Sequence, residues 1–215
     1  MNERGTVISV NVGRPKDLLV GSRIRATGIF KEPQEGRVPI RGEAVGDDVQ
    51  IDKKYHGGPY QAVYAYAQED YDWWSEELAR ELTPGMFGEN ITTRGIDVTN
   101  ALLGERWRVG TALLEVTDPR VPCSTLRSRM GIPGFVKTFA QAGRFGAYFS
   151  IVEEGDVGAG DAVEIVDRPG HGVTIARMGA AMVHRDVAEA EAMVEALGGP
   201  VRRVLWLESL RGKQG

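Results

Sequence analysis

The chain has 215 residues, of which 42% are hydrophobic and 26% charged, a net charge of −4 and a single cysteine. These values argue against a nucleic-acid polymer as partner, because its binders carry a basic face. They also exclude an intramolecular disulfide and a cysteine-rich zinc site. No apolar run approaches the roughly 20 residues that span a bilayer, and the polar start Met1–Arg4 is unlike a signal peptide. We expect a cytoplasmic protein without membrane partners, as a monomer or homodimer.

Short extended segments punctuated by glycine and proline dominate residues 1–168. This pattern is typical of a mainly β (α+β) fold with small helical insertions. The predicted strands are Thr6–Val12, Ile24–Phe30, Ala62–Tyr66, Asn90–Thr93, Arg106–Val109, Ala112–Thr117, Tyr148–Val152 and Ala162–Val166. Eight such segments favour a β-barrel.

Two insertions have helical periodicity instead. From Gln68 to Thr83, apolar residues recur at spacings of three and four, which predicts a helix that ends before Pro84. A second helix is predicted over Gly134–Ala142, with Gly143 placed to cap it in a left-handed conformation.

The strand pattern stops at Arg168, and three short helical patterns follow. Thr174 and Asp186 are suitable N-caps for the first two, and Pro200 begins the third. Each helix is too short to be stable alone, so the three must pack together or onto the barrel. We predict a barrel domain over residues 1–168 and a three-helix domain over residues 169–215.

The only cysteine, Cys123, lies in a window without acidic residues. Pro119–Val152 contains no Asp or Glu but five cations, which are Arg120, Arg127, Arg129, Lys137 and Arg144. Positive surroundings lower the pKa of a thiol and favour the thiolate, which ligates metals and attacks electrophiles. Arginines also bind anionic groups such as phosphate. The alternatives are a small buried thiol and a solvated helix face.

Two loops are further candidates. Asp52–Pro59, which includes Lys54 and His56, contains paired glycines that let backbone amides approach a ligand, and His56 can exchange protons near neutral pH. Pro84–Thr93 presents Asn90, Thr92 and Thr93 to a polar ligand. The alternatives are a strand-entry turn with a surface histidine, and a loop whose polar side chains satisfy their own backbone.

Four motifs, in chain order, resemble the signatures of the MOSC superfamily and in particular its YiiM-like branch. They are His56–Pro59 (HGGP), Pro84–Asn90 (PGMFGEN), Gly104–Gly110 (GERWRVG) and Pro119–Cys123 (PRVPC). The resemblance runs from about Thr6 to the C-terminus and includes the helical tail, which is similar to the small three-helix domain of that branch. One departure is Asp47, which stands where that branch usually has glycine, whereas Asp48 is retained.

The resemblance implies a MOSC-type β-barrel that binds molybdenum cofactor (molybdopterin), with Cys123 as the molybdenum ligand. It also implies reduction of N-hydroxylated compounds, such as hydroxylaminopurines, with electrons from a flavoprotein partner. Cys123, His56 and Asp52 are then the predicted catalytic residues, the last two as proton donors. The predicted cofactor-binding residues are Arg120, Ser124, Lys54, Asn90, Thr92, Thr93 and Arg127.

Two other functions stay open. The chain can be a sulfur carrier that holds a persulfide on Cys123 for the assembly of a metal–sulfur cofactor. It carries no sequence typical of a pyridoxal-phosphate lysine site, so that cofactor would belong to a partner. The chain can also be a module that binds molybdenum cofactor without catalysis.

Overall fold

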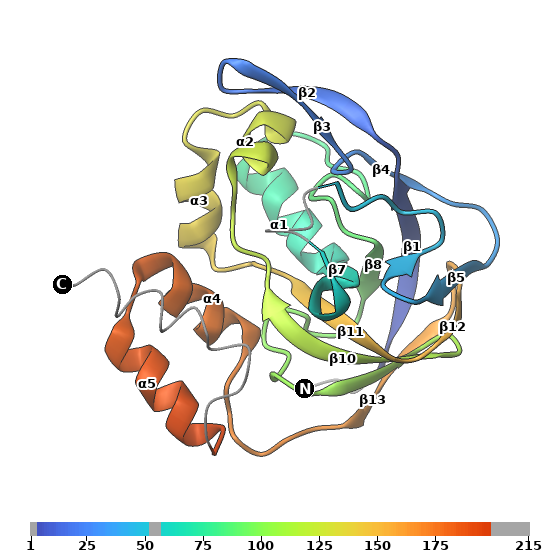
Figure 1. Cartoon of the computed structure of the whole chain (residues 1–215), viewed down its shortest axis with the longest axis vertical. Helices are drawn as coiled ribbons and strands as arrows, with labels where there is room; N and C mark the ends of the chain where they lie inside the picture. The colour runs from blue at the N-terminus through green and yellow to red at the C-terminus, as the bar shows by residue number, and fades with distance from the viewer. Residues whose placement is uncertain (1–3, 52–56, 199–215) are drawn as a thin grey trace.

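The computed structural model describes residues 4–51 and 57–198. Seven strands form a closed β-barrel, which confirms the predicted fold class (Figure 1). They are β1 (Arg4–Gly13), β7 (Val63–Ala67), β8 (Ile91–Arg94), β9 (Arg106–Val109), β10 (Ala112–Pro119), β11 (Ala147–Glu153) and β13 (Ala162–Asp167). All seven correspond to predicted strands, with ends that differ by no more than two residues.

The barrel closes because β1 pairs on both sides. Around the barrel the order is β13, β9, β10, β11, β7, β8 and β1, and β1 then pairs with β13 through Arg4 and Glu164. The pair β7–β8 is parallel, and the other pairs in the ring are antiparallel. Buried residues of these strands fill the interior, among them Trp107 and Phe149, whose ring centroids lie 5.1 Å apart.

The remaining strands lie outside the ring. They are β2 (Lys16–Val20), β3 (Arg23–Thr27), β4 (Lys31–Pro33), β5 (Val38–Arg41), β6 (Ala44–Val45) and β12 (Gly155–Val157). β2 and β3 form a separate hairpin, so the predicted strand Ile24–Phe30 is not part of the barrel. It also ends earlier than predicted, at Thr27. β4 extends the sheet beyond the far end of β1, while β5, β6 and β12 form a small sheet of their own.

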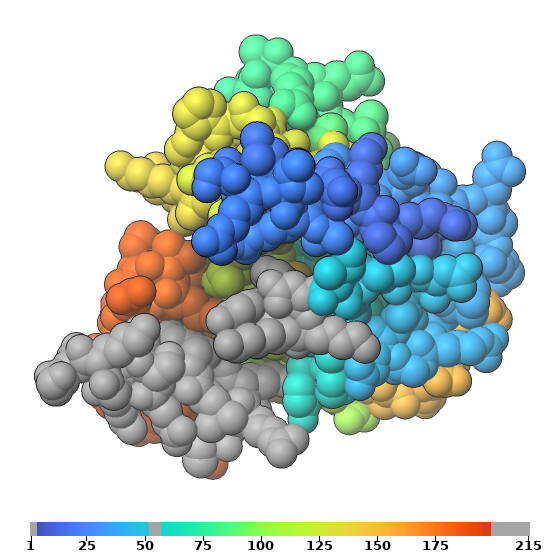
Figure 2. Space-filling view, turned by 45° about the horizontal axis from the view of Figure 1, so that its top comes forward, coloured from blue at the N-terminus to red at the C-terminus, as the bar shows by residue number. Residues whose placement is uncertain are grey.

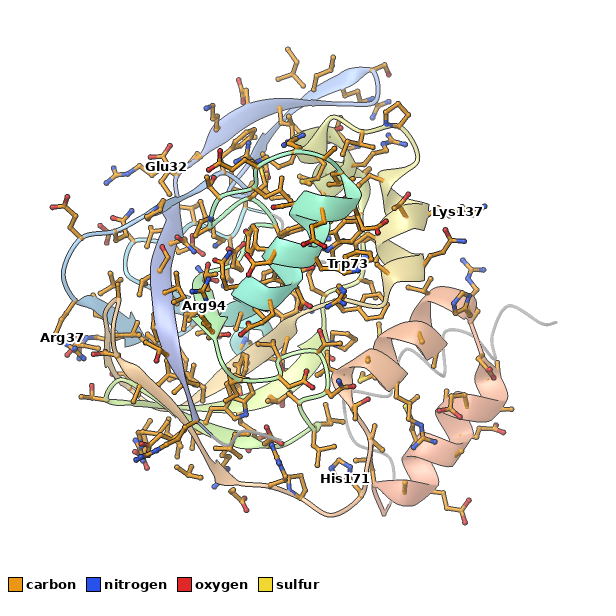
Figure 3. All side chains as sticks on the ribbon, turned by 180° about the vertical axis from the view of Figure 1, so that it is seen from behind. Glu32, Arg37, Trp73, Arg94, Lys137 and His171 are labelled. Atoms are coloured by element: carbon orange, nitrogen blue, oxygen red, sulfur yellow. The ribbon has the colours of Figure 1, made fainter. Side chains whose placement is uncertain are left out.

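Three helices cover one side of the barrel: α1 (Gln68–Glu77), α2 (Ser124–Met130) and α3 (Phe135–Ala142). Figure 3 shows α1 lying across the barrel beside α3. Trp74 of α1 stacks on Phe139 of α3, with ring centroids 5.8 Å apart. Gly143 caps α3 at φ 68°, as predicted. A short 3-10 helix, η1 (Pro59–Gln61), precedes β7.

The predicted extent of α1 is wrong at its C-terminal end. The helix ends at Glu77, not Thr83, because Ala79 adopts a left-handed conformation with φ 45°. The amide of Ala79 donates to the Glu76 carbonyl, and that of Arg80 to the Ser75 carbonyl. These two bonds make a Schellman motif, which satisfies the last carbonyls of a helix.

Two of the three predicted C-terminal helices lie within the described residues: α4 (Ile175–His184) and α5 (Val187–Ala196). Thr174 and Asp186 cap them as predicted, each accepting a hydrogen bond from the amide three residues later. Ile175 packs into the buried cluster of the barrel, so α4 is attached directly to it. The predicted third helix lies outside the described residues. None of the described helices is long and apolar enough to cross a membrane.

Candidate functional site

A cavity of about 150 Å³, room for roughly ten water molecules, lies beside one end of the barrel. The hairpin β2–β3, which packs against α2, forms one of its walls; Figure 2 shows the hairpin in blue next to the yellow helical segment. The polar or charged lining residues are Arg25, Thr27, Lys31, Asp48, Gln50, Gln61, Tyr64, Asn90, Arg120, Cys123, Thr125 and Tyr148.

Cys123 and Arg120 lie together in the cavity wall. Cys123 precedes α2 in an extended conformation, and Arg120 is 5% exposed. The Nη2 of Arg120 donates to the sulfur of Cys123 at 3.9 Å, and its Nη1 donates to the carbonyl of Val121 at 3.1 Å. Burial lowers the pKa of Arg120, but Cys123 and nearby tyrosines outweigh this and raise it above its usual value. The guanidinium therefore stays charged and places a positive charge beside the sulfur of Cys123.

A second polar group in the wall is built on Asp48. Its Oδ2 accepts from the Nζ of Lys31 and, at 3.0 Å, from the amide of Asn90, while its Oδ1 accepts from the Gly13 N–H at 2.7 Å. The side chains of Lys31 and Asp48 are 9% and 1% exposed. Burial lowers the pKa of Lys31, and the ion pair with Asp48 opposes this shift.

Glu89, which precedes Asn90 in the sequence, is the centre of a buried hydrogen-bond network. Its Oε1 accepts from the hydroxyls of Tyr71 and Thr92 and from the Gly85 amide, at 2.6 to 2.8 Å. Its Oε2 has no hydrogen-bond partner among the described residues, and burial raises the pKa of Glu89. Glu89 is not part of the cavity wall. The network fixes the loop before β8, and with it Asn90.

The structure brings together three of the predicted site residues: Cys123, Arg120 and Asn90 all line the cavity. Four others are placed elsewhere. Thr92 and Thr93 are buried in β8, and Ser124 and Arg127 are exposed on α2. Asp52, Lys54 and His56 lie outside the described residues.

Sequence reasoning missed Lys31 and Tyr148, and it noted Asp48 only as a retained residue. No local pattern marks a lysine in the three-residue strand β4 as buried. For Tyr148, the sequence predicts a position in a strand but no role in the site. Asp47, the departure from the branch pattern, is exposed and does not line the cavity.

The barrel is that of a known class of domain. The model of the MOSC domain family matches residues 52–164, which include Asn90, Arg120, Cys123 and Tyr148. The chain belongs to the MOSC domain family.

Curated relatives support this assignment. The chain is 36% identical over 173 residues to the uncharacterized protein YflK of Bacillus subtilis strain 168, covering 80% of this chain and 78% of YflK. It is 31% identical over 147 residues to YiiM of Escherichia coli K12, covering 67% of this chain and 66% of YiiM. A protein named reductase from Gibberella moniliformis is 31% identical over 169 residues, which are 77% of this chain and 30% of that protein.

Solved structures extend the similarity to almost the whole chain. YiiM from Geobacillus stearothermophilus is similar with a TM-score of 0.76 and 28% identity, covering 96% of this chain and 98% of that one. YiiM from Escherichia coli has the same fold with a TM-score of 0.71, at 23% identity and 100% and 95% coverage. The predicted resemblance to the YiiM-like branch is confirmed.

The cavity wall suits a metal ion that is already coordinated by an organic cofactor. Within residues 4–51 and 57–198, no three His, Cys, Asp or Glu side chains are grouped to hold a bare ion. One soft thiolate beside a buried guanidinium fits a metal already chelated by an anionic organic cofactor, since the thiolate completes the ligand set and the cation meets the negative charge.

Proposed function

We propose that the chain is a molybdenum-cofactor-binding oxidoreductase that reduces N-hydroxylated compounds with electrons from a flavoprotein partner. The observation that carries the proposal is the pairing of Cys123 with the buried Arg120 in the cavity wall. Membership of the MOSC family and a relative named reductase support it. We further propose that the protein is cytoplasmic and acts as a monomer or homodimer.

Three residues of the wall have a defined task in this proposal. The sulfur of Cys123 would ligate the metal, and the positive charge of Arg120 beside it would bind negative charge. Asn90 is held by Asp48 and by the Tyr64 amide, so it positions the wall more than it binds a ligand. When bound, the cofactor would supply two-electron redox chemistry.

The reaction consumes two protons and two electrons for each N-hydroxyl group, and it yields an amine and water. The flavoprotein supplies the electrons. His56 and Asp52 are the proposed proton donors, since imidazole exchanges protons near neutral pH and a carboxyl group can act as a general acid. A His56→Ala variant that kept its cofactor and full turnover would exclude His56 from this role.

The first test is the metal and pterin content of wild type and Cys123→Ser, both made in a host that synthesises molybdenum cofactor. We expect near-stoichiometric molybdenum in the wild type and its loss in the variant, because a hydroxyl is a poor ligand for a soft metal centre. Ser128→Ala is the matched control, since Ser128 lies on α2 but does not line the cavity, and it should retain the metal.

Other outcomes separate the competing functions. A wild type without molybdenum, despite sufficient cofactor supply, would contradict the proposal and favour a persulfide carrier, in which Arg120 stabilises the sulfur anion of Cys123. If the wild type retains cofactor but does not reduce hydroxylaminopurine, whichever reduced flavoprotein is added, the chain is a cofactor-binding module without catalysis.

A further inference from the structure

Several polar side chains of the cavity wall already have hydrogen-bond partners. Lys31 and Asn90 both donate to Asp48. The amide group of Gln50 donates to the carbonyls of Glu43 and Gln61 and accepts from a backbone N–H. A group whose hydrogen bonds are already made gives little to a ligand, because binding would have to break them.

Tyr148 differs from this pattern. It lies on β11 and lines the cavity, and its ring packs on that of Tyr64 with centroids 5.0 Å apart. The Tyr64 hydroxyl donates to the carbonyl of Phe145 at 2.9 Å, whereas the Tyr148 hydroxyl has no hydrogen bond to any residue the structure describes. A tyrosine hydroxyl within a protein normally has a partner, so this one is available to a ligand.

The surroundings of Tyr148 fix its protonation state. Burial raises the pKa of its phenol to about 12; Arg120 opposes this shift and Cys123 adds to it. The hydroxyl therefore remains protonated throughout the physiological pH range and is a neutral donor. These electrostatic interactions also place Tyr148 on the part of the wall that carries Arg120 and Cys123, consistent with its position opposite Asp118 in the pairing of β11 with β10.

We propose that the Tyr148 hydroxyl donates a hydrogen bond to the oxygen of a bound N-hydroxyl group, and so selects N-hydroxylated compounds over the corresponding amines. This inference rests on the proposed function. A site that hydrogen-bonds a substrate oxygen loses that bond when the oxygen is absent, which discriminates between the two ligands and also favours release of the amine product.

The test measures binding without turnover. Holoprotein without an electron donor is titrated with 6-hydroxylaminopurine and with adenine, which differ by one oxygen atom. In the wild type we expect tighter binding of the hydroxylamino compound. In Tyr148→Phe we expect that affinity to fall about fivefold, the usual size of one neutral hydrogen bond, while the affinity for adenine stays the same.

Tyr66→Phe is the matched control, because its hydroxyl is already bonded to the Arg144 carbonyl and Tyr66 does not line the cavity. It should keep the wild-type ratio of the two affinities. Pterin content and thermal unfolding are compared so that a loss of cofactor or fold is not mistaken for a lost contact. In wild type labelled with 3-fluorotyrosine, the ¹⁹F signal of Tyr148 should move with hydroxylaminopurine and not with adenine.

Each alternative result has a separate meaning. If Tyr148→Phe weakens the binding of both ligands equally, or keeps the wild-type preference, the proposed role of Tyr148 is wrong while the proposed function stands. If the wild-type holoprotein binds neither purine and reduces no hydroxylaminopurine, the proposed function fails and the assignment of Tyr148 fails with it.

Discussion

Lys31 is the residue in the cavity wall that depends most on a single partner. It is nearly buried, and its charge is balanced by Asp48, which in turn holds Asn90. Removing one member of a buried ion pair costs more than the pair contributes, because it leaves the other charge without compensation.

We therefore expect Asp48→Asn to lower the free energy of unfolding by about 3 kcal/mol at pH 6. Loss of Asp48 lowers the pKa of Lys31 in the folded state further, since the ion pair is what opposes the effect of burial. Below this lowered pKa, Lys31 is charged in the folded protein, and its uncompensated buried charge destabilises the fold. As the pH rises from this pKa towards the higher pKa of Lys31 in the unfolded chain, folded Lys31 loses its proton and the destabilisation becomes smaller. The loss should thus be smaller at pH 9 than at pH 6, as measured by urea denaturation.

Asp47→Asn is the control for this prediction, because Asp47 is the neighbouring carboxylate and is exposed. Its effect should stay within about 0.5 kcal/mol. A loss of equal size in both variants would mean that the ion pair of Lys31 is not the cause.

The candidate site could be predicted only where charge is unevenly distributed along the sequence. Cys123 and Arg120 stand out because no acid follows them in the chain until Glu153, and the structure places them in one cavity wall. Lys31 and Tyr148 reach the same wall because β4 pairs with β1 and β11 pairs with β10. Their proximity is a product of topology, which a single sequence does not reveal.

At the scale of elements, the C-terminal end of α1 carries an unfavourable residue. Ala79 occupies the left-handed position of a Schellman motif, is exposed, and has φ 45°. A side chain with a Cβ is strained there by about 1 kcal/mol, whereas glycine is not. This conformation also explains why helical periodicity extended beyond Glu77: Leu82 is buried, but through the following turn and not on the helix.

Ala79→Gly should therefore stabilise the protein by about 1 kcal/mol, contrary to the usual effect of glycine near a helix. Thermal or chemical denaturation measures the change. Ala192→Gly, in the exposed middle of α5, serves as the opposite control and should destabilise by about 1 kcal/mol. Two changes of the same sign would show that the left-handed conformation of Ala79 is not strained.

The barrel strands were predictable because they are short extended segments bounded by glycine, proline and other turn residues. Alternation was not the signal, since all five residues of β7 are buried. The short strands β5, β6 and β12 were not predictable, since two to four residues are too few to mark such a segment. The hairpin β2–β3 was only half recognised because it packs against α2 and leaves Leu19 and Ile24 exposed.

At the scale of the whole molecule, α4 is joined to the barrel through close packing at Gly179. A Cβ on this residue would lie 2.4 Å from the ring of the buried Phe145. Ile175 on the same helix belongs to the barrel's buried cluster, and its amide donates to the Ala101 carbonyl. These contacts predict that α4 and the barrel unfold together. The domain boundary at Arg168 stays a prediction.

Gly179→Ala should destabilise the protein by about 2 kcal/mol, because overpacking against Phe145 outweighs the better helix propensity of alanine. Calorimetry should show a single transition at a lower temperature. Phe145→Leu in the same chain should restore part of the loss, since it makes room for the added methyl group. A stabilised Gly179→Ala variant would contradict the predicted packing.

Closure of the barrel also has a consequence for how the chain is made. β1 is synthesised first, yet its pairing with β13 joins Arg4 to Glu164, near opposite ends of the barrel sequence. Until β13 has left the ribosome, one edge of β1 has no partner strand from the ring, and an open edge can pair with other chains. The entropy of closing this long loop is also lost late, which makes folding slow. Nascent chains that stop before Ala162 should therefore be the form of this protein most prone to aggregation.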